Sequence, residues 1–64
     1  MVSNWINVYD MKRYKVDVFC GGSIWQTITD ALNNVEAEKL TRRAYIEEYG
    51  TNNIIVLRIE QLNN

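Results

Sequence analysis

The stretch that decides the fold is YKVDVFCGGSIWQTIT, residues 14–29 of this 64-residue chain. Polar and apolar residues alternate along its first half, and both halves are rich in β-branched and aromatic residues. Alternation with a period of two is typical of strands that bury one face. Gly21 and Gly22 lie between the halves and supply the backbone freedom that a tight turn requires. We therefore expect a β-hairpin over residues 12–30.

The length of the hairpin loop determines which side chains face the core. A three-residue loop is our first expectation, and it gives one core face: Tyr14, Val16, Val18, Cys20, Ile24 and Ile28. Phe19 and Trp25 then form a cross-strand aromatic pair on the other, largely polar face. A two-residue loop instead turns Trp25 toward the core and exposes Ile24 and Ile28. Both registers remain open at this point.

A helix is expected over residues 33–50. Asn33 or Asn34 can cap its first turn, acidic residues follow near its positive end, and Gly50 is a natural left-handed stop. At 100° per residue, one helix face gathers the side chains expected to pack on the sheet: Ala37, Leu40, Thr41, Ala44 and Tyr45.

Residues 53–61 carry the strongest strand pattern. Their apolar run from Ile54 to Leu57 is unbroken, which predicts a strand inside the sheet with both faces covered. The expected fold is α+β: a small sheet of three strands with one helix on one face, in the order ββαβ, as a single domain over residues 1–64. Residues 1–11 are a possible fourth, edge strand or an arm that docks on a neighbour.

One helix can cover only one face of such a sheet, so the other face is expected to be available for a partner. The residues expected on that interaction surface are Phe19, Trp25, Ile54 and Val56. A domain of this size buries only about 60% of the surface that its unfolded chain exposes, so association would add stability. We expect a homo-oligomer, a dimer in the first instance, and a protein partner.

The composition argues against catalysis and metal binding. The chain has no histidine and one cysteine, so it lacks the commonest general base, the usual zinc ligands and any internal disulfide. Cys20 is expected on the core face, where a thiol behaves as a small hydrophobic group. We expect no enzymatic activity, no metal and no cofactor.

Seven basic and eight acidic residues leave the chain nearly neutral, which gives no overall attraction to nucleic acid or membranes. The basic cluster Lys12, Arg13 and Lys15 surrounds Tyr14, and it supports nucleic-acid binding as an alternative function. Arg42 could contact a small anion held at an oligomer interface, which is a further alternative. The sequence shows neither a membrane-spanning apolar run nor a secretory signal, so a cytoplasmic protein is expected.

The order of the motifs also carries a resemblance. YKVDVF, WQTI, EAEKLTRRAYIEEYG and IIVLRI follow one another over residues 14–59. This order resembles small accessory proteins of phages and bacteria that consist of a hairpin, a helix ending in Tyr-Gly and a final strand. The resemblance implies a viral protein that acts in the host cytoplasm by binding and blocking another molecule. It implies no catalytic residues, and residues 5–11 lie outside it.

Overall fold

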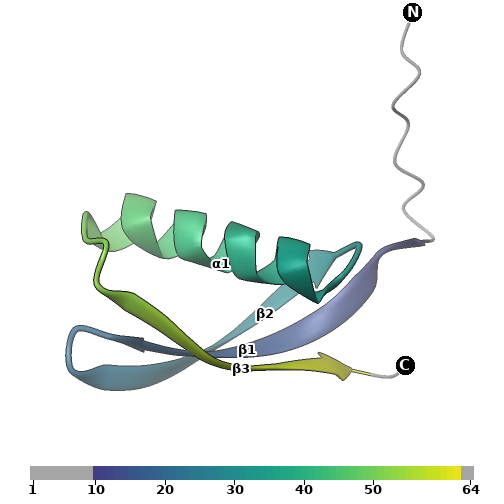
Figure 1. Ribbon diagram of the computed structural model, residues 1–64, viewed down its shortest axis with the longest axis horizontal. Coiled ribbons are helices and arrows are strands. Elements are labelled where there is room, and N and C mark those ends of the chain that lie inside the picture. The colour runs from purple at the N-terminus through teal and green to yellow at the C-terminus, as the bar shows by residue number, and fades with distance from the viewer. Residues whose placement is uncertain (1–9, 63–64) are drawn as a thin grey trace, which may run out of the picture.

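The computed structural model describes residues 10–62 and has an α+β fold in which one helix lies across one face of a sheet (Figure 1). The elements follow in the order β1 (Lys12–Cys20), β2 (Ser23–Ala31), α1 (Asn34–Tyr49) and β3 (Ile54–Leu62). This confirms the ββαβ order that the sequence predicts. The possible strand or arm at residues 1–11 lies almost wholly outside the described residues.

The three strands form one antiparallel sheet in the order β2-β1-β3. Among residues 10–62, β1 is therefore the central strand and β3 lies at an edge, so the prediction that the last strand lies inside the sheet is wrong. The register of β3 shifts between its partners Asp17 and Val18, where Leu57 is an extra residue. The apolar run of β3 includes this bulge residue and Ile55, which are both about half exposed, so the run does not reflect coverage of both faces.

The hairpin has a two-residue loop, and the three-residue loop expected first is wrong. Cys20 pairs directly with Ser23 across the turn. Gly21 and Gly22 both have positive φ angles, 63° and 81°, which a two-residue turn matched to the strand twist requires. Only glycine adopts two such angles in succession without a steric cost, so the Gly-Gly pair determines the register.

The helix begins and ends at the expected caps. The side chain of Asn33 accepts a hydrogen bond from the backbone N–H of Glu36 at 2.9 Å. The residue before the cap is hydrogen-bonded as well: the backbone N–H of Leu32 donates to the Glu36 carboxylate at 2.7 Å. Gly50 has a φ of 66° and donates its N–H to the carbonyl of Ile46, which closes the last turn.

The core lies between α1 and the face of the sheet that the even-numbered residues of β1 form. Its buried hydrophobic members are Tyr14, Val16, Val18, Cys20, Ala31, Ala37 and Ile54. The helix contributes small side chains here, Ala37 and the buried Thr41, which allow it to lie close to the sheet. Leu40 and Ala44, which the helical periodicity assigns to the core, are exposed. The helix therefore contacts the sheet through a narrower stripe than the sequence predicts.

Candidate protein-interaction face

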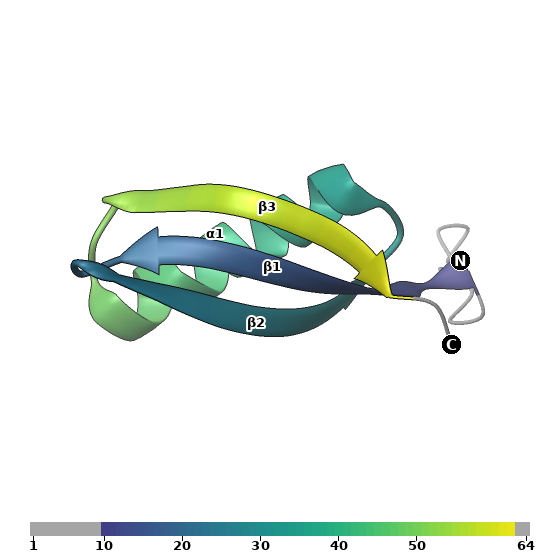
Figure 2. The same ribbon diagram turned by 90° about the horizontal axis from the view of Figure 1, so that it is seen from below.

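The side of the sheet turned away from α1 is called the open face here, and Figure 2 looks onto it. Three residues, one from each strand, form the row of this face nearest the hairpin turn. Phe19 of β1 is in the middle and pairs with Ile24 of β2 on one side and with Ile55 of β3 on the other. Ile28 lies further along β2 on the same face, opposite Lys15. The exposed fractions are 38% for Phe19, 65% for Ile24, 55% for Ile55 and 53% for Ile28.

Phe19, Ile24 and Ile55 form an apolar row that spans all three strands near the hairpin turn, and Ile28 lies further along β2, beyond Gln26. Leu57, the bulge residue of β3, is a further exposed apolar side chain, with 51% of its surface accessible. Large contiguous apolar patches are uncommon on the surfaces of monomeric proteins, and where they occur they mark interaction sites. The open face is therefore the strongest candidate for a functional site.

The charged side chains of the open face are largely paired with one another. Arg13 donates from Nε to the Asp30 carboxylate at 3.0 Å, and Lys15 lies 3.7 Å from Glu60. Arg58 approaches the same Glu60 carboxylate at 3.6 Å. The hydrogen bond from Arg13 lowers the pKa of Asp30, and its positive charge adds to that effect. The face therefore presents apolar groups and matched charges.

One carboxylate of this face has a different environment. Asp17 lies between Gln26 and Arg58 in the cross-strand register. Its Oδ1 atom is inaccessible to solvent and has no hydrogen-bond partner among residues 10–62. Arg58, the residue opposite, contacts Glu60 instead.

Trp25 does not lie on the open face, which corrects the expected pairing with Phe19. Its partner in the register is Val18, so the two-residue loop turns the indole to the helix side. The ring stacks on Tyr49 with 6.4 Å between centroids and remains 44% exposed. It lies at the wall of a hollow of about 450 Å³ between the hairpin turn and the loop after α1, lined by Cys20, Gly21, Trp25, Tyr49, Thr51 and Asn53.

Ile54 and Val56 also lie on the helix side, contrary to the expected interaction surface. Ile54 pairs with Cys20 and is 5% exposed, and Val56 pairs with Val18 and packs against the core. Their position follows from the register, because partners in directly opposed positions share a face of the sheet. Of the four residues expected on the surface, Phe19 alone is on the open face.

The basic cluster does not converge on one site. Tyr14 is buried in the core with 4% of its surface exposed, so its ring is not free to stack on a base. Arg13 and Lys15 lie on the opposite face, where each is ion-paired. Lys12 extends toward the backbone carbonyls of Asp10 and Leu32, 3.4 Å from each.

Arg42, the candidate anion contact, has two structural partners. Its Nε lies 3.0 Å from the Glu38 carboxylate, and its Nη1 donates to the Ile54 carbonyl at 2.8 Å. It therefore connects α1 to the first residue of β3.

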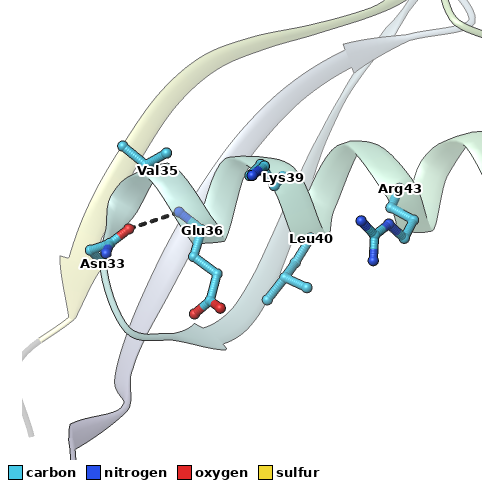
Figure 3. A pocket seen from close by; sticks show the side chains of 6 residues that line it. All are labelled: Asn33, Val35, Glu36, Lys39, Leu40 and Arg43. Atoms are coloured by element: carbon cyan, nitrogen blue, oxygen red, sulfur yellow. Dashed lines mark hydrogen bonds between the residues drawn. The ribbon is translucent and has the colours of Figure 1, made fainter. Parts of the chain in front are cut away.

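A second, open hollow lies beside the first turns of α1 (Figure 3). It measures about 370 Å³, and its lining is Asn33, Val35, Glu36, Lys39, Leu40 and Arg43. The Asn33 side chain and the Glu36 carboxylate are already engaged in the helix cap. We assign no ligand to this hollow.

Within residues 10–62, no three His, Cys, Asp or Glu side chains gather closely enough to hold a metal ion. Across the same part of the chain, no helix is long and apolar enough to cross a membrane. Cys20 is buried, as expected.

The exposed residues Ile24, Ile28 and Ile55 are those that the sequence prediction missed. The sequence contains a signal for Ile24 and Ile28. Gly-Gly is a typical two-residue hairpin turn, and a two-residue loop turns both isoleucines away from the helix. The chain matches no family model, no curated protein and no solved structure.

Proposed function

We propose that this protein is a non-enzymatic interaction protein whose open face binds an apolar surface of a protein partner. The observation that carries the proposal is the row formed by Ile24, Phe19 and Ile55, which lie side by side on a sheet face that no helix of residues 10–62 covers. Each Å² of apolar area that binding removes from water contributes about 25 cal/mol of favourable free energy, so covering these side chains favours association.

The electrostatics of the face support a protein partner over a polyanion. Its three cations, Arg13, Lys15 and Arg58, each lie within ion-pairing distance of a carboxylate of the same face. A nucleic acid is bound mainly through unpaired cations that replace its counterions. The matched charges instead suit the polar rim of a protein interface, which surrounds an apolar centre.

The resemblance to phage and bacterial accessory proteins gives this proposal a biological setting. In that setting the protein acts in the host cytoplasm and blocks its partner by occupying an apolar surface. The proposed mode of action requires no catalytic group, metal or cofactor.

The test compares two variants of the full chain in affinity capture from native cells. Phe19→Ser combined with Ile55→Ser removes the centre of the face, whereas Val35→Ser removes an apolar side chain that is 67% exposed on the helix. We expect the wild type and Val35→Ser to retain the same partner and the double variant to lose it. Circular dichroism establishes that both variants are folded. Equal capture by both variants would contradict the proposal.

A further inference from the structure

The two outer strands of the sheet differ in how they are protected. β3 carries a bulge and two charged residues, Arg58 and Glu60, which are common devices against edge-to-edge pairing. β2 has none of these along residues 23–29: its pairing with β1 is regular, and it contains neither charge nor proline in this span. Asp30 is its one charged residue, close to its end. The outer edge of β2 is thus a regular, uncharged strand edge.

The hairpin register indicates which backbone groups this edge presents. The residues flanking a two-residue loop form a hydrogen-bonded pair, and such pairs alternate along an antiparallel ladder. Starting from the pair Cys20 and Ser23, the N–H and C=O groups of Ile24, Gln26 and Ile28 are therefore directed outward. None of these groups has a backbone partner in another strand among residues 10–62.

The sequence of β2 is complementary to itself in one antiparallel register. With Gln26 opposite Gln26 of a second copy, Ile24 lies opposite Ile28 of that copy, and the reverse contact follows by symmetry. These positions are the outward-directed ones, so three residue pairs exchange roughly six hydrogen bonds. Asp30 lies beyond the paired span in this register, so no like charges face each other.

Shifting the two-fold centre to Thr27 has a cost. Ile24 then lies opposite Asp30 of the other copy, and the contact between isoleucines is lost. Of these two registers, the one centred on Gln26 pairs isoleucine with isoleucine and glutamine with glutamine at the outward-directed positions.

We propose that β2 pairs with β2 of a second copy in the register centred on Gln26, which produces a continuous six-stranded antiparallel sheet. Two antiparallel copies of one edge strand in a continuous sheet are related by a two-fold axis perpendicular to the sheet. Rotation about this axis leaves each face of the sheet on its own side, so both helices lie on the same side. The two open faces then join into one face, on which Ile24 of each copy lies beside Ile28 of the other and the two Gln26 side chains lie at the axis. This dimer uses the strand edge and not the open face, so it stands or falls separately from the proposed function.

Disulfide cross-linking tests the register. Directly opposed residues in a hydrogen-bonded pair have Cα atoms about 5.5 Å apart, within the range that a disulfide spans. We expect Gln26→Cys to form a covalent dimer under mild oxidation. Ile28→Cys alone should not, because two copies of residue 28 are roughly 14 Å apart along the strand. A mixture of Ile24→Cys and Ile28→Cys chains should cross-link. The wild type is the control for Cys20, which is buried.

Sedimentation tests the edge without adding a thiol. Gln26→Lys places two ammonium groups against each other at the axis, and we expect the dimer Kd to rise about tenfold or more, whereas Gln26→Ala changes it little. A monomeric wild type at about 100 µM would overturn the proposal. An unchanged Kd for Gln26→Lys, or efficient cross-linking of Ile28→Cys alone, would also overturn it. A dimer lost in Phe19→Ser but retained in Gln26→Lys would place the contact on the open face and refute edge pairing.

Discussion

The indole Nε1 of Trp25 donates a hydrogen bond to the backbone carbonyl of Cys20 at 2.9 Å. Cys20 is the last residue of β1, so this bond connects the side chain of one hairpin strand to the end of the other. The same indole stacks on Tyr49 in the last turn of α1. Trp25 thereby holds together the hairpin turn and the C-terminal end of the helix.

This geometry predicts two separable losses of stability. Trp25→Phe keeps an aromatic ring against Tyr49 but loses the hydrogen bond, and we expect the free energy of unfolding to fall by about 1 kcal/mol. Trp25→Ala also loses the ring contacts and should cost roughly 2 kcal/mol, since the ring is only partly buried. Urea denaturation of both variants measures the difference. Equal losses for the two variants would show that the ring contacts add nothing beyond the hydrogen bond.

The fate of Trp25 illustrates what could be predicted from the sequence. Alternation along residues 14–20 correctly identifies the core face of β1, because one strand has only two possible faces and one of them is more apolar. In β2 both faces are partly apolar, with Ile24 and Ile28 on one and Trp25 on the other, so composition alone does not choose between them. The turn decides, and the evidence available in the sequence was the Gly21-Gly22 pair, whose φ angles are both positive in the structure.

Arg42 is expected to stabilise the fold mainly through its bond to the Ile54 carbonyl. Its ion pair with Glu38 is partly exposed on both sides and should contribute little. We therefore expect Glu38→Gln to change the free energy of unfolding by less than about 0.5 kcal/mol. Arg42→Ala, which also leaves the carbonyl without this donor, should cost about 1 kcal/mol or more.

Thermal and urea unfolding of the two variants provide the comparison. Arg43→Ala is the matched control on the same helix, because Arg43 is exposed and makes no ion pair or hydrogen bond within residues 10–62. If Glu38→Gln proved as destabilising as Arg42→Ala, the ion pair and not the carbonyl contact would be the source of the stability.

The missed role of Arg42 has a different origin from the missed face of Trp25. Helical periodicity locates a side chain on the helix but contains no information about the loop that follows. The contact with Ile54 depends on the path of residues 51–53 between α1 and β3, which bring that carbonyl to the helix. The bulge at Leu57 could not be predicted either, because it depends on how β3 pairs with β1, and the sequence of one strand does not contain that information.

The Arg13–Asp30 pair predicts a small dependence of stability on pH. The hydrogen bond from Arg13 lowers the pKa of Asp30 below its ordinary value of 3.8, and the charge of Arg13 acts in the same direction. Because the pKa is lower in the folded state, the stabilisation is present above about pH 3.8 and is lost as the pH falls through the folded-state pKa. An NMR titration of the Asp30 carboxyl carbon in the wild type and in Arg13→Gln measures this effect.

We expect the pKa of Asp30 to be higher in Arg13→Gln than in the wild type. Asp30→Asn should remove this part of the acid dependence of unfolding and leave stability at neutral pH almost unchanged, since both side chains are about half exposed. An identical Asp30 titration in the two proteins would show that the pair does not form in solution.

The hydroxyl of Thr41 is expected to cost stability. Thr41 is 1% exposed, and its Oγ1 has no hydrogen-bond partner among the described residues, although it faces the core beneath α1. A buried hydroxyl without a partner loses its bonds to water and gains none. Thr41→Val replaces it with a methyl group of similar shape and similar helix propensity, and we expect the free energy of unfolding to rise by about 1 kcal/mol.

Thr41→Ser separates the hydroxyl from the methyl group at the same position. It retains the polar atom and removes the apolar contact, so it should lower the free energy of unfolding by about 1 kcal/mol. Urea denaturation of both variants therefore should give changes of opposite sign. Destabilisation by Thr41→Val would mean that Oγ1 has a partner in solution, such as a buried water or a carbonyl of the preceding helical turn, because only a satisfied hydroxyl is costly to remove.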